Sequence, residues 1–532
     1  MKPVGWVWLA VGLILLNLSV TFANIWPTFG IRLTHELSAE LAALVLGLMI
    51  AWRWRATRSV VALRVMSAFW VVLVLGRYVE VTARSLYGRD INLFWDLQHV
   101  PNVGAMFSAV ADPFLRIGFV AALLFIPIVL YIVVRLALVC VVSATSVPKL
   151  RLALSFVSGV VLLVAVAQNV GARVPERIQV AAPVTSAYLE ELSELVYEMT
   201  GAGVRSLAPP LSLQSNLSGV SGADVFLIFL ESYGTVSWDR PEFASALVDN
   251  REQFASDITD TGRAVVSGRV ESTTFGGESW LAHISLLSGT EVRDPGTNKR
   301  LMAQDRDTLV KLFGRHGYRT VAVMPGLQRA WPQGEFYGFE EIYDLARLDY
   351  RGPPFGWWDL NDQFALARID SLEIVEQTRR PAFVVFPTVT THAPFVPTPP
   401  YQSDWSRLLS DSPYDQIELD RSWSEYPDWL NLGPSYVKAL GYAYKTIGGY
   451  LRLRASRDLV LILVGDHQPP ALVSGEGASW DVPIHVITTR QGLLDNLKRH
   501  GFVDGLSPDS PTLARMDTLL PLLLDVFDIQ SN

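Results

Sequence analysis

The sequence predicts an α/β fold, in which a domain with a mainly parallel sheet flanked by helices follows an apolar helical third. Charge divides the chain in two. Residues 1–170 carry a net charge of +7 and residues 171–532 a net charge of −15, within a total of −8. In the second part, apolar runs typical of buried parallel strands alternate with helical patterns over roughly 300 residues.

Five apolar stretches predict a transmembrane domain of about five helices over residues 1–170. A helix needs about 20 apolar residues to cross a bilayer, and the fourth stretch is long enough by itself. The stretches are Val4–Ala23, Leu37–Trp52, Val65–Leu75, Ile117–Val142 and Leu152–Val166. The first is too long in its apolar core for a signal peptide, and no small-residue cleavage site follows it. Residues 77–116 are expected to form a polar loop.

Basic residues predict the orientation of these spans. With five spans, three basic sites fall on the same side, which the positive-inside rule makes cytoplasmic. These sites are Lys2, the group Arg53, Arg55 and Arg58, and the group Arg135, Lys149 and Arg151. After an odd number of spans, the acidic remainder lies outside.

A connector over residues 171–222 is expected to join the two parts. Ala187–Thr200 has the pattern of a short amphipathic helix, and Ala208–Ser221 is a linker rich in Pro, Ser and Gly. The α/β domain then occupies residues 223–532. Its predicted strands are Asp224–Leu230, Thr320–Met324, Ala382–Pro387, Leu459–Val464 and Pro483–Ile487. Its predicted helices are Trp280–Leu287, Thr308–His316, Asp362–Thr378, Tyr436–Leu453 and Pro511–Val526.

Composition excludes several classes of protein. The charged share is 18%, against about 25% in an ordinary soluble chain, so a single soluble domain and a disordered chain are excluded. The acidic balance also argues against a nucleic-acid binder that works through bulk positive charge. Cys140 is the single cysteine, so no intrachain disulfide can form.

Polar residues follow three of the predicted strands. Glu231 follows the first strand, the segment Thr388–His392 follows the third, and Asp466 and His467 come shortly after the fourth. Ligands of open parallel sheets bind beyond the carboxyl ends of the strands. Strand ends favour polar residues in any case, but the three positions together predict a metal or phosphate site.

Ser279 comes after two glycines and at or near the start of a predicted helix. It could serve only as an N-cap. A helix N-terminus also binds anions, and a hydroxyl placed there can attack a bound phosphorus. His283, one turn further on, could contribute to the site, but it is expected to pack or face solvent. The Gly356–Trp358 loop covers a pocket, dips into the membrane interface or packs.

Four motifs carry a resemblance to a known family. They are LESYG (Leu230–Gly234), FGGESWLAHISLLSG (Phe275–Gly289), TTHAPF (Thr390–Phe395) and GDHQPP (Gly465–Pro470). Together with the N-terminal spans, they resemble the lipoteichoic-acid synthase and phosphoglycerol transferase branch of the sulfatase-like, alkaline phosphatase superfamily. The resemblance implies a multi-pass protein of the bacterial cytoplasmic (inner) membrane, with its catalytic domain on the periplasmic or extracellular side.

The resemblance also implies an activity and its residues. A metal-dependent phosphotransferase would move a phospholipid head group, phosphoglycerol preferred, to a glycan or polymer through a phosphoryl-Ser279 intermediate. The implied metal ligands are Glu231, Ser279, Asp466 and His467; the implied catalytic residues are Ser279 and His392; the implied substrate-binding residues are Trp331, Arg329 and His392. Oxygen donors with one imidazole suit one or two divalent ions such as Mn²⁺, Mg²⁺ or Zn²⁺. The partners implied are the lipid donor, the acceptor and the membrane, with no nucleic acid.

Four features bear on the alternatives. Ser279 stands where this branch more often has Thr, and the disulfides of related phosphoethanolamine transferases are absent. Gln333 occupies the position expected for a substrate-binding Arg, with Arg329 as a possible substitute. No Cys or Ser lies in the C/S-x-P-x-R context that a sulfatase needs. The alternatives are a phosphoethanolamine transferase, a phosphodiesterase or sulfatase-like hydrolase, and a degenerate scaffold for envelope polymer export.

Overall fold

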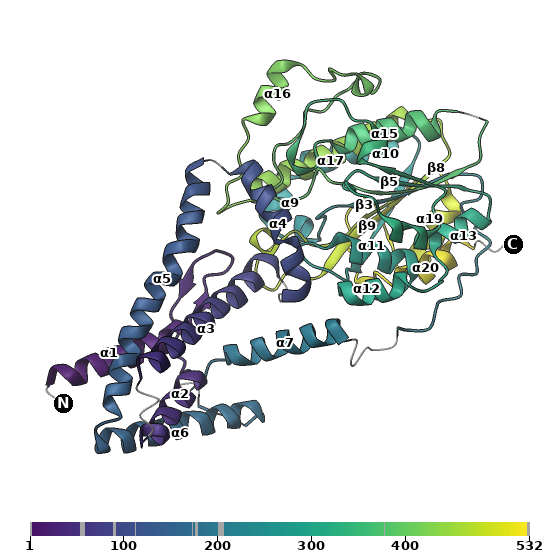
Figure 1. Ribbon diagram of the computed structural model, residues 1–532. Helices are drawn as coiled ribbons and strands as arrows, with labels where there is room; N and C mark the ends of the chain where they lie inside the picture. Colours follow the sequence, from purple (N-terminus) through teal and green to yellow (C-terminus); the bar gives the residue numbers. More distant parts are fainter. Residues whose placement is uncertain are drawn as a thin grey trace. The chain divides into compact units, whose positions relative to one another are not determined.

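A computed structural model describes residues 3–53, 59–88, 92–111, 113–172, 174–175, 179–200, 207–376 and 378–528. The chain divides into two compact units, residues 1–204 and residues 205–532. Figure 1 shows the elements of each unit, coloured along the sequence.

The N-terminal unit is helical. Its helices are α1 (Pro3–Thr21), α2 (Ala39–Ile50), α3 (Val60–Tyr87), α4 (Leu93–Val110), α5 (Pro113–Ala144), α6 (Pro148–Asn169) and α7 (Val184–Thr200), with a short hairpin of β1 (Ala23–Asn24) and β2 (Ile31–Arg32). Helix α1 packs on α5, α3 packs on α5, and α2 packs on α6. All five predicted apolar stretches are therefore helical.

Three helices, α3, α5 and α6, are long and apolar enough to cross a membrane, by length and composition. Helices α1 and α2 are shorter, and the 12 residues of α2 extend over only about 18 Å. The predicted number of five spans is therefore approximate. Lys2, Arg55 and Arg58 lie outside the described residues, and the orientation stays a prediction.

The expected polar loop at residues 77–116 is wrong, because most of it is helical. Helix α3 continues to Tyr87, and α4 follows from Leu93. Arg77, one of the charges that suggested a loop, is buried in α3. Its guanidinium donates to the carbonyl of Phe22 at 3.0 Å and pairs with Glu80 at 3.4 Å. A charge satisfied inside the helix bundle does not interrupt the helix.

The C-terminal unit is built on a nine-stranded sheet in the order β10-β4-β9-β8-β3-β7-β5-β6, with β11 paired to β4. The strands are β3 (Asp224–Leu230), β4 (Ala264–Glu271), β5 (Arg319–Met324), β6 (Glu341–Asp344), β7 (Ala382–Pro387), β8 (Leu459–Gly465), β9 (Asp481–Thr488), β10 (Val503–Asp504) and β11 (Thr512–Arg515). Strands β8, β3, β7, β5 and β6 run parallel, and β9 is antiparallel to β8 and β4. The predicted α/β class with a mainly parallel sheet is confirmed.

Helices cover both faces of this sheet, as Figure 1 shows. One face packs on α10 (Val248–Thr259), α15 (Asp362–Ile369) and α17 (Gly433–Leu453), and the other on α11 (Ser279–Ser288), α13 (Leu309–Arg315), α19 (Gln491–Arg499) and α20 (Leu519–Phe527). Alternate side chains of β3 supply the two cores: Phe226 faces the first and Leu227 the second. A strand buried on both faces must be apolar throughout, which explains its sequence.

The remaining helices connect these strands and helices along the chain. They are α8 (Val236–Asp239), α9 (Pro241–Ala246), α12 (Pro295–Met302), α14 (Leu345–Leu348), α16 (Gln416–Trp423) and α18 (Ala471–Ser474), together with a π-helical turn at Asp370–Ile374. The helix predicted at Pro511–Val526 begins only at Leu519, since Thr512–Arg515 pairs with β4. The helix predicted at Asp362–Thr378 ends at Ile369 and passes into the π-helical turn.

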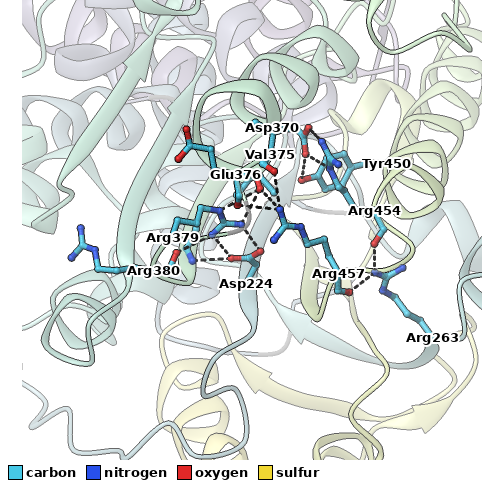
Figure 2. Close-up of polar contacts among 12 residues, drawn as sticks. Asp224, Arg263, Asp370, Val375, Glu376, Arg379, Arg380, Tyr450, Arg454 and Arg457 are labelled. Atoms are coloured by element: carbon cyan, nitrogen blue, oxygen red, sulfur yellow. Dashed lines mark hydrogen bonds and ion pairs between the residues drawn. The ribbon is translucent and has the colours of Figure 1, made fainter.

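A polar network fixes the amino end of β3, shown in Figure 2. The Asp224 carboxylate accepts hydrogen bonds from two guanidinium nitrogens of Arg379, at 2.7 and 2.6 Å, and from the backbone N–H of Ala382 at 2.9 Å. Nearby, Arg454 pairs with Asp370. This network lies at the end of the sheet opposite Glu231, so it anchors the central strand away from the candidate site.

Candidate active site

Neighbouring parallel strands bring the candidate metal ligands together. Strands β3 and β8 pair with Leu230 opposite Gly465, so the residues that follow them leave the sheet side by side. One ligand atom each from Glu231, Asp466 and His467 lies within 4.8 Å of the other two, and all three residues are buried. The sequence prediction that these side chains converge agrees with this geometry.

Ser279 reaches the same point from the start of α11. The preceding residues take left-handed or glycine-only backbone conformations, with φ of 68° at Gly276, 154° at Gly277 and 60° at Glu278. This turn points the hydroxyl at the cluster. Its Oγ donates to Glu231 Oε2 at 2.7 Å and lies 3.1 Å from His467 Nε2. Ser279 is the first residue of α11, after Glu278 at the N-cap position, so its hydroxyl does not serve as the N-cap.

A hydrogen bond to a backbone carbonyl orients the His467 ring. Its Nδ1 lies 2.7 Å from the carbonyl oxygen of Gln468. Since a carbonyl only accepts, Nδ1 carries the proton, and Nε2 faces Ser279 and Glu231, with 3.3 Å to Glu231 Oε1. An imidazole fixed in this way presents Nε2 to a metal ion.

The two oxygens of Asp466 have different surroundings. Oδ1 accepts the backbone N–H groups of Ser232 at 2.9 Å and His467 at 2.7 Å. Oδ2 is buried and makes no hydrogen bond with any described residue. A buried carboxylate oxygen without a donor is costly, and a cation would satisfy it.

Electrostatics within the cluster shift its pKa values strongly. Burial alone would lower the pKa of His467, but the carboxylates of Asp466 and Glu231 outweigh it and raise the pKa to about 9. Burial alone would raise the pKa of Glu231, and the positive charge of His467 outweighs it and lowers the pKa. For Asp466, burial and the charge of Glu231 both raise the pKa. Without an ion, a proton on His467 holds the two acids together.

The donor set fits a divalent ion. Two carboxylates, one hydroxyl and one imidazole are the hard and borderline ligands that Mn²⁺, Mg²⁺ and Zn²⁺ accept. The orphaned Asp466 Oδ2 independently indicates a missing positive charge. Glu231, Ser279, Asp466 and His467 are the residues that would hold the ion.

Gln468 ties together three segments that carry the cluster. Its amide nitrogen donates to Thr235 Oγ1 at 3.1 Å and to the carbonyl of Asp481 at 2.8 Å. Its backbone carbonyl accepts the N–H of Gly276 at 3.1 Å, in the turn before Ser279. Gly234 lies so close that a Cβ there would meet Gln468 Oε1 at 1.7 Å. The sequence interpretation had given this glutamine no role.

The loop after β7 carries His392 beside this cluster. His392 is half-buried, its Nδ1 lies 2.7 Å from the carbonyl of Ala393, and its charge contributes to the low pKa of Glu231. Trp358 packs edge-on against the His392 ring at 5.7 Å between centroids. Packing on His392 is thus one role of the Gly356–Trp358 loop.

Asp362, which the sequence interpretation placed only within a helix, holds the same loop. Its carboxylate accepts the backbone N–H groups of Val389 at 2.8 Å and Thr390 at 3.0 Å. Burial, with a smaller effect from the charge of Glu231, raises the pKa of Asp362 to about 6. From the sequence alone, an acidic residue in the first turn of a helix indicates only a role in helix capping.

Arg329 and Trp331 lie in the segment after β5. Arg329 is exposed, and Trp331 packs on Tyr337 at 5.4 Å between centroids. Among the described residues, neither side chain forms a hydrogen bond, ion pair or ring contact with Glu231, Ser279, Asp466 or His467. Their substrate-binding role stays a prediction.

Comparison with known proteins agrees with the fold. Residues 283–486 match the family model described as Sulfatase, a range that contains His392, Asp466 and His467 and begins after Ser279. This match confirms the resemblance to the sulfatase-like superfamily. No curated protein sequence matches the chain.

Three solved structures are similar to this chain. The lipoteichoic acid synthase LtaP from Listeria monocytogenes has 14% identity over 60% of this chain and 76% of its own, with a TM-score of 0.41. The lipooligosaccharide phosphoethanolamine transferase A (EptA) from Neisseria meningitidis has 14% identity over 92% and 89%, with a TM-score of 0.47. The Streptococcus pyogenes phosphoglycerol transferase GacH, in complex with sn-glycerol-1-phosphate, has 12% identity over 64% and 91%, with a TM-score of 0.34.

Proposed function

From the Sulfatase match of residues 283–486, we propose that this protein is a membrane-anchored, metal-dependent phosphotransferase. It moves a phospholipid-derived head group, phosphoglycerol preferred, to an extracytoplasmic glycan or polymer. The observation that carries the proposal is the position of Ser279 Oγ, hydrogen-bonded to Glu231 and next to His467 at the start of a helix. The preference for phosphoglycerol rests on the motif resemblance and on the lack of any cysteine pair.

The reaction proceeds in two displacements at Ser279. Its Oγ attacks the head-group phosphorus, the Oγ–P bond forms, and the bond from phosphorus to the diacylglycerol oxygen breaks. Glu231 Oε2 accepts the hydroxyl hydrogen in a hydrogen bond, which orients Oγ, and the proton passes to water as the Oγ–P bond forms. The leaving oxygen takes a proton from His392 or water. An acceptor hydroxyl then attacks the phosphorus and gives its proton to His392 or water, and Ser279 Oγ takes up a proton from water as the P–Oγ bond breaks.

Glu231, Ser279, Asp466 and His467 would hold a divalent ion, whose positive charge would stabilise the phosphoryl oxygens and lower the pKa of the attacking hydroxyl. The start of α11 adds its backbone N–H groups on the same side. Sulfate-ester hydrolysis is disfavoured, because Ser279 is followed by Trp280-Leu281-Ala282 rather than the context needed for formylglycine formation.

The test is the substitution Ser279→Ala in the full-length protein in detergent or vesicles. With labelled phosphatidylglycerol, the wild type should release diacylglycerol and accumulate a phosphoryl group on Ser279 that mass spectrometry of quenched samples detects. Ser279→Ala should lose both signals and keep its thermal stability. Ser288→Ala, the same change at the far end of α11, serves as the control and should remain active. Full turnover in Ser279→Ala would exclude the nucleophile assignment.

The acceptor is tested separately. The labelled lipid is supplied with and without a glycan, and the labelled product is identified. Transfer predicts that label moves to the glycan. Release of free glycerol phosphate alone, unaffected by the glycan, would make the protein a hydrolase and overturn the transferase proposal.

A further inference from the structure

His283 lies on the same face of α11 as Ser279, one turn further along. Its ring packs against Phe229 of β3, with 4.3 Å between the ring centroids. The side chain is 15% exposed, so it is neither a solvated surface histidine nor a fully enclosed core residue. The helix that directs Ser279 Oγ toward Glu231 therefore directs the His283 imidazole toward the other side of the cluster.

The atom nearest to His283 Nε2 on that side is Asp466 Oδ2, at 3.8 Å. Both atoms are buried, and neither forms a hydrogen bond with a described residue. Asp466 itself is 1% exposed, so bulk solvent does not reach its free oxygen. A pair of unsatisfied polar atoms that face each other inside a protein requires an explanation.

The separation of 3.8 Å is too long for a hydrogen bond. It matches the spacing of two ligand atoms that share one cation. Ligands at about 2.1 Å from a metal, with an angle of roughly 110–130° between them, are about 3.4–3.8 Å apart. An ion between the two atoms would satisfy both of them. The ligand atoms that already lie within 4.8 Å of one another belong to Glu231, Asp466 and His467, so an ion shared with these residues would draw the His283 ring closer to them.

We propose that His283 is a further ligand of the divalent metal centre and binds the ion through Nε2 together with Asp466 Oδ2. The centre then has two imidazole ligands, His467 and His283, which come from different elements. His283 binds on the Asp466 side, while Ser279 and Glu231 lie beside His467. This inference rests on the proposed metal dependence but not on the identity of the substrate.

The number of imidazole ligands can be counted directly. The full-length protein in detergent is loaded with one equivalent of Mn²⁺, and electron spin echo envelope modulation measures the nitrogen nuclei coupled to the ion. We expect two imidazole nitrogens in the wild type and one in His283→Gln. Mn²⁺ affinity, measured by titration, should fall at least about 10- to 100-fold, since loss of even outer-sphere partners has effects of that size.

His316→Gln is the matched control, because His316 is exposed at the end of α13. It should keep both nitrogen couplings and the wild-type affinity. A single imidazole coupling in the wild type, unchanged in His283→Gln, would overturn the inference even if the variant folds poorly. In that case the proposed phosphotransferase would still stand. Complete absence of Mn²⁺ binding would overturn both the inference and the metal dependence.

Discussion

Acidification is expected to weaken binding of a divalent ion to this protein, because His467 must lose a proton before it can coordinate. The neighbouring carboxylates raise the pKa of His467 to about 9, so at pH 7 only about 1% of the rings are neutral. The apparent affinity at pH 7 should therefore lie about 100-fold below its limit at high pH. Between pH 6 and 8 it should change about tenfold for each pH unit.

Isothermal titration of Mn²⁺ into the full-length protein at pH 6.5, 7.0, 7.5 and 8.0 measures this dependence. Parallel titrations in buffers of different ionisation enthalpy should show about one proton released for each ion bound. His467→Gln should bind more weakly and lose the pH dependence, whereas Ser279→Ala should keep it. An affinity that stays constant across this range in the wild type would refute the reasoning.

The raised pKa of His467 predicts the opposite pH dependence for the stability of the metal-free protein, which should fall as the pH rises. The folded-state pKa of His467 is raised above its unfolded value of about 6.5. Its stabilising contribution is therefore present in full below about pH 6.5 and is lost as the pH rises toward 9. Metal-free protein should melt at a lower temperature at pH 9 than at pH 6.5, and Mn²⁺ should stabilise it more at the higher pH.

Two further predictions concern the scaffold of the site. Asp224→Asn leaves a largely buried arginine without its carboxylate partner and should lower the free energy of unfolding by about 3 kcal/mol. Asp415→Asn, which breaks an exposed ion pair, should change it by less than about 1 kcal/mol, and equal losses in the two variants in urea unfolding would contradict this difference. Gly234→Ala should reduce Mn²⁺ binding, because its Cβ would collide with the Gln468 side chain and also lie 2.9 Å from the Gln468 Cα. Gly314→Ala, whose Cβ has 3.8 Å to its nearest neighbour, should bind like the wild type, and wild-type binding by Gly234→Ala would count against the role of Gln468.

Sequence patterns predicted the central strands well because those strands are buried on both faces. Asp224–Leu230 and Ala382–Pro387 are apolar runs with sharp ends, and the structure has the same bounds. The antiparallel strand β4 was missed because Ser267 and Arg269 interrupt its apolar pattern. Ser267 bonds to His485 and to the carbonyl of Gly505, and Arg269 pairs with Asp239. Such partners are distant in sequence, so no local pattern reveals them.

Local sequence patterns also revealed only part of the candidate site. Glu231, Asp466 and His467 were found because each follows a recognisable strand or motif. His283 and Asp362 were not, since their importance depends on which atoms they face. The i, i+4 spacing from Ser279 was a signal for His283, but only the unsatisfied oxygen of Asp466 gave it weight.

Because the side chain and backbone of Gln468 connect the loops that carry the cluster, the site has little freedom to change size. A rigid cage cannot contract around a small ion or open for a large one. Ions should therefore be selected by how well their radius and preferred geometry match a fixed set of oxygens and nitrogens. Cellular abundance of an ion would then matter less than its fit to ligand positions that the folded chain has already set.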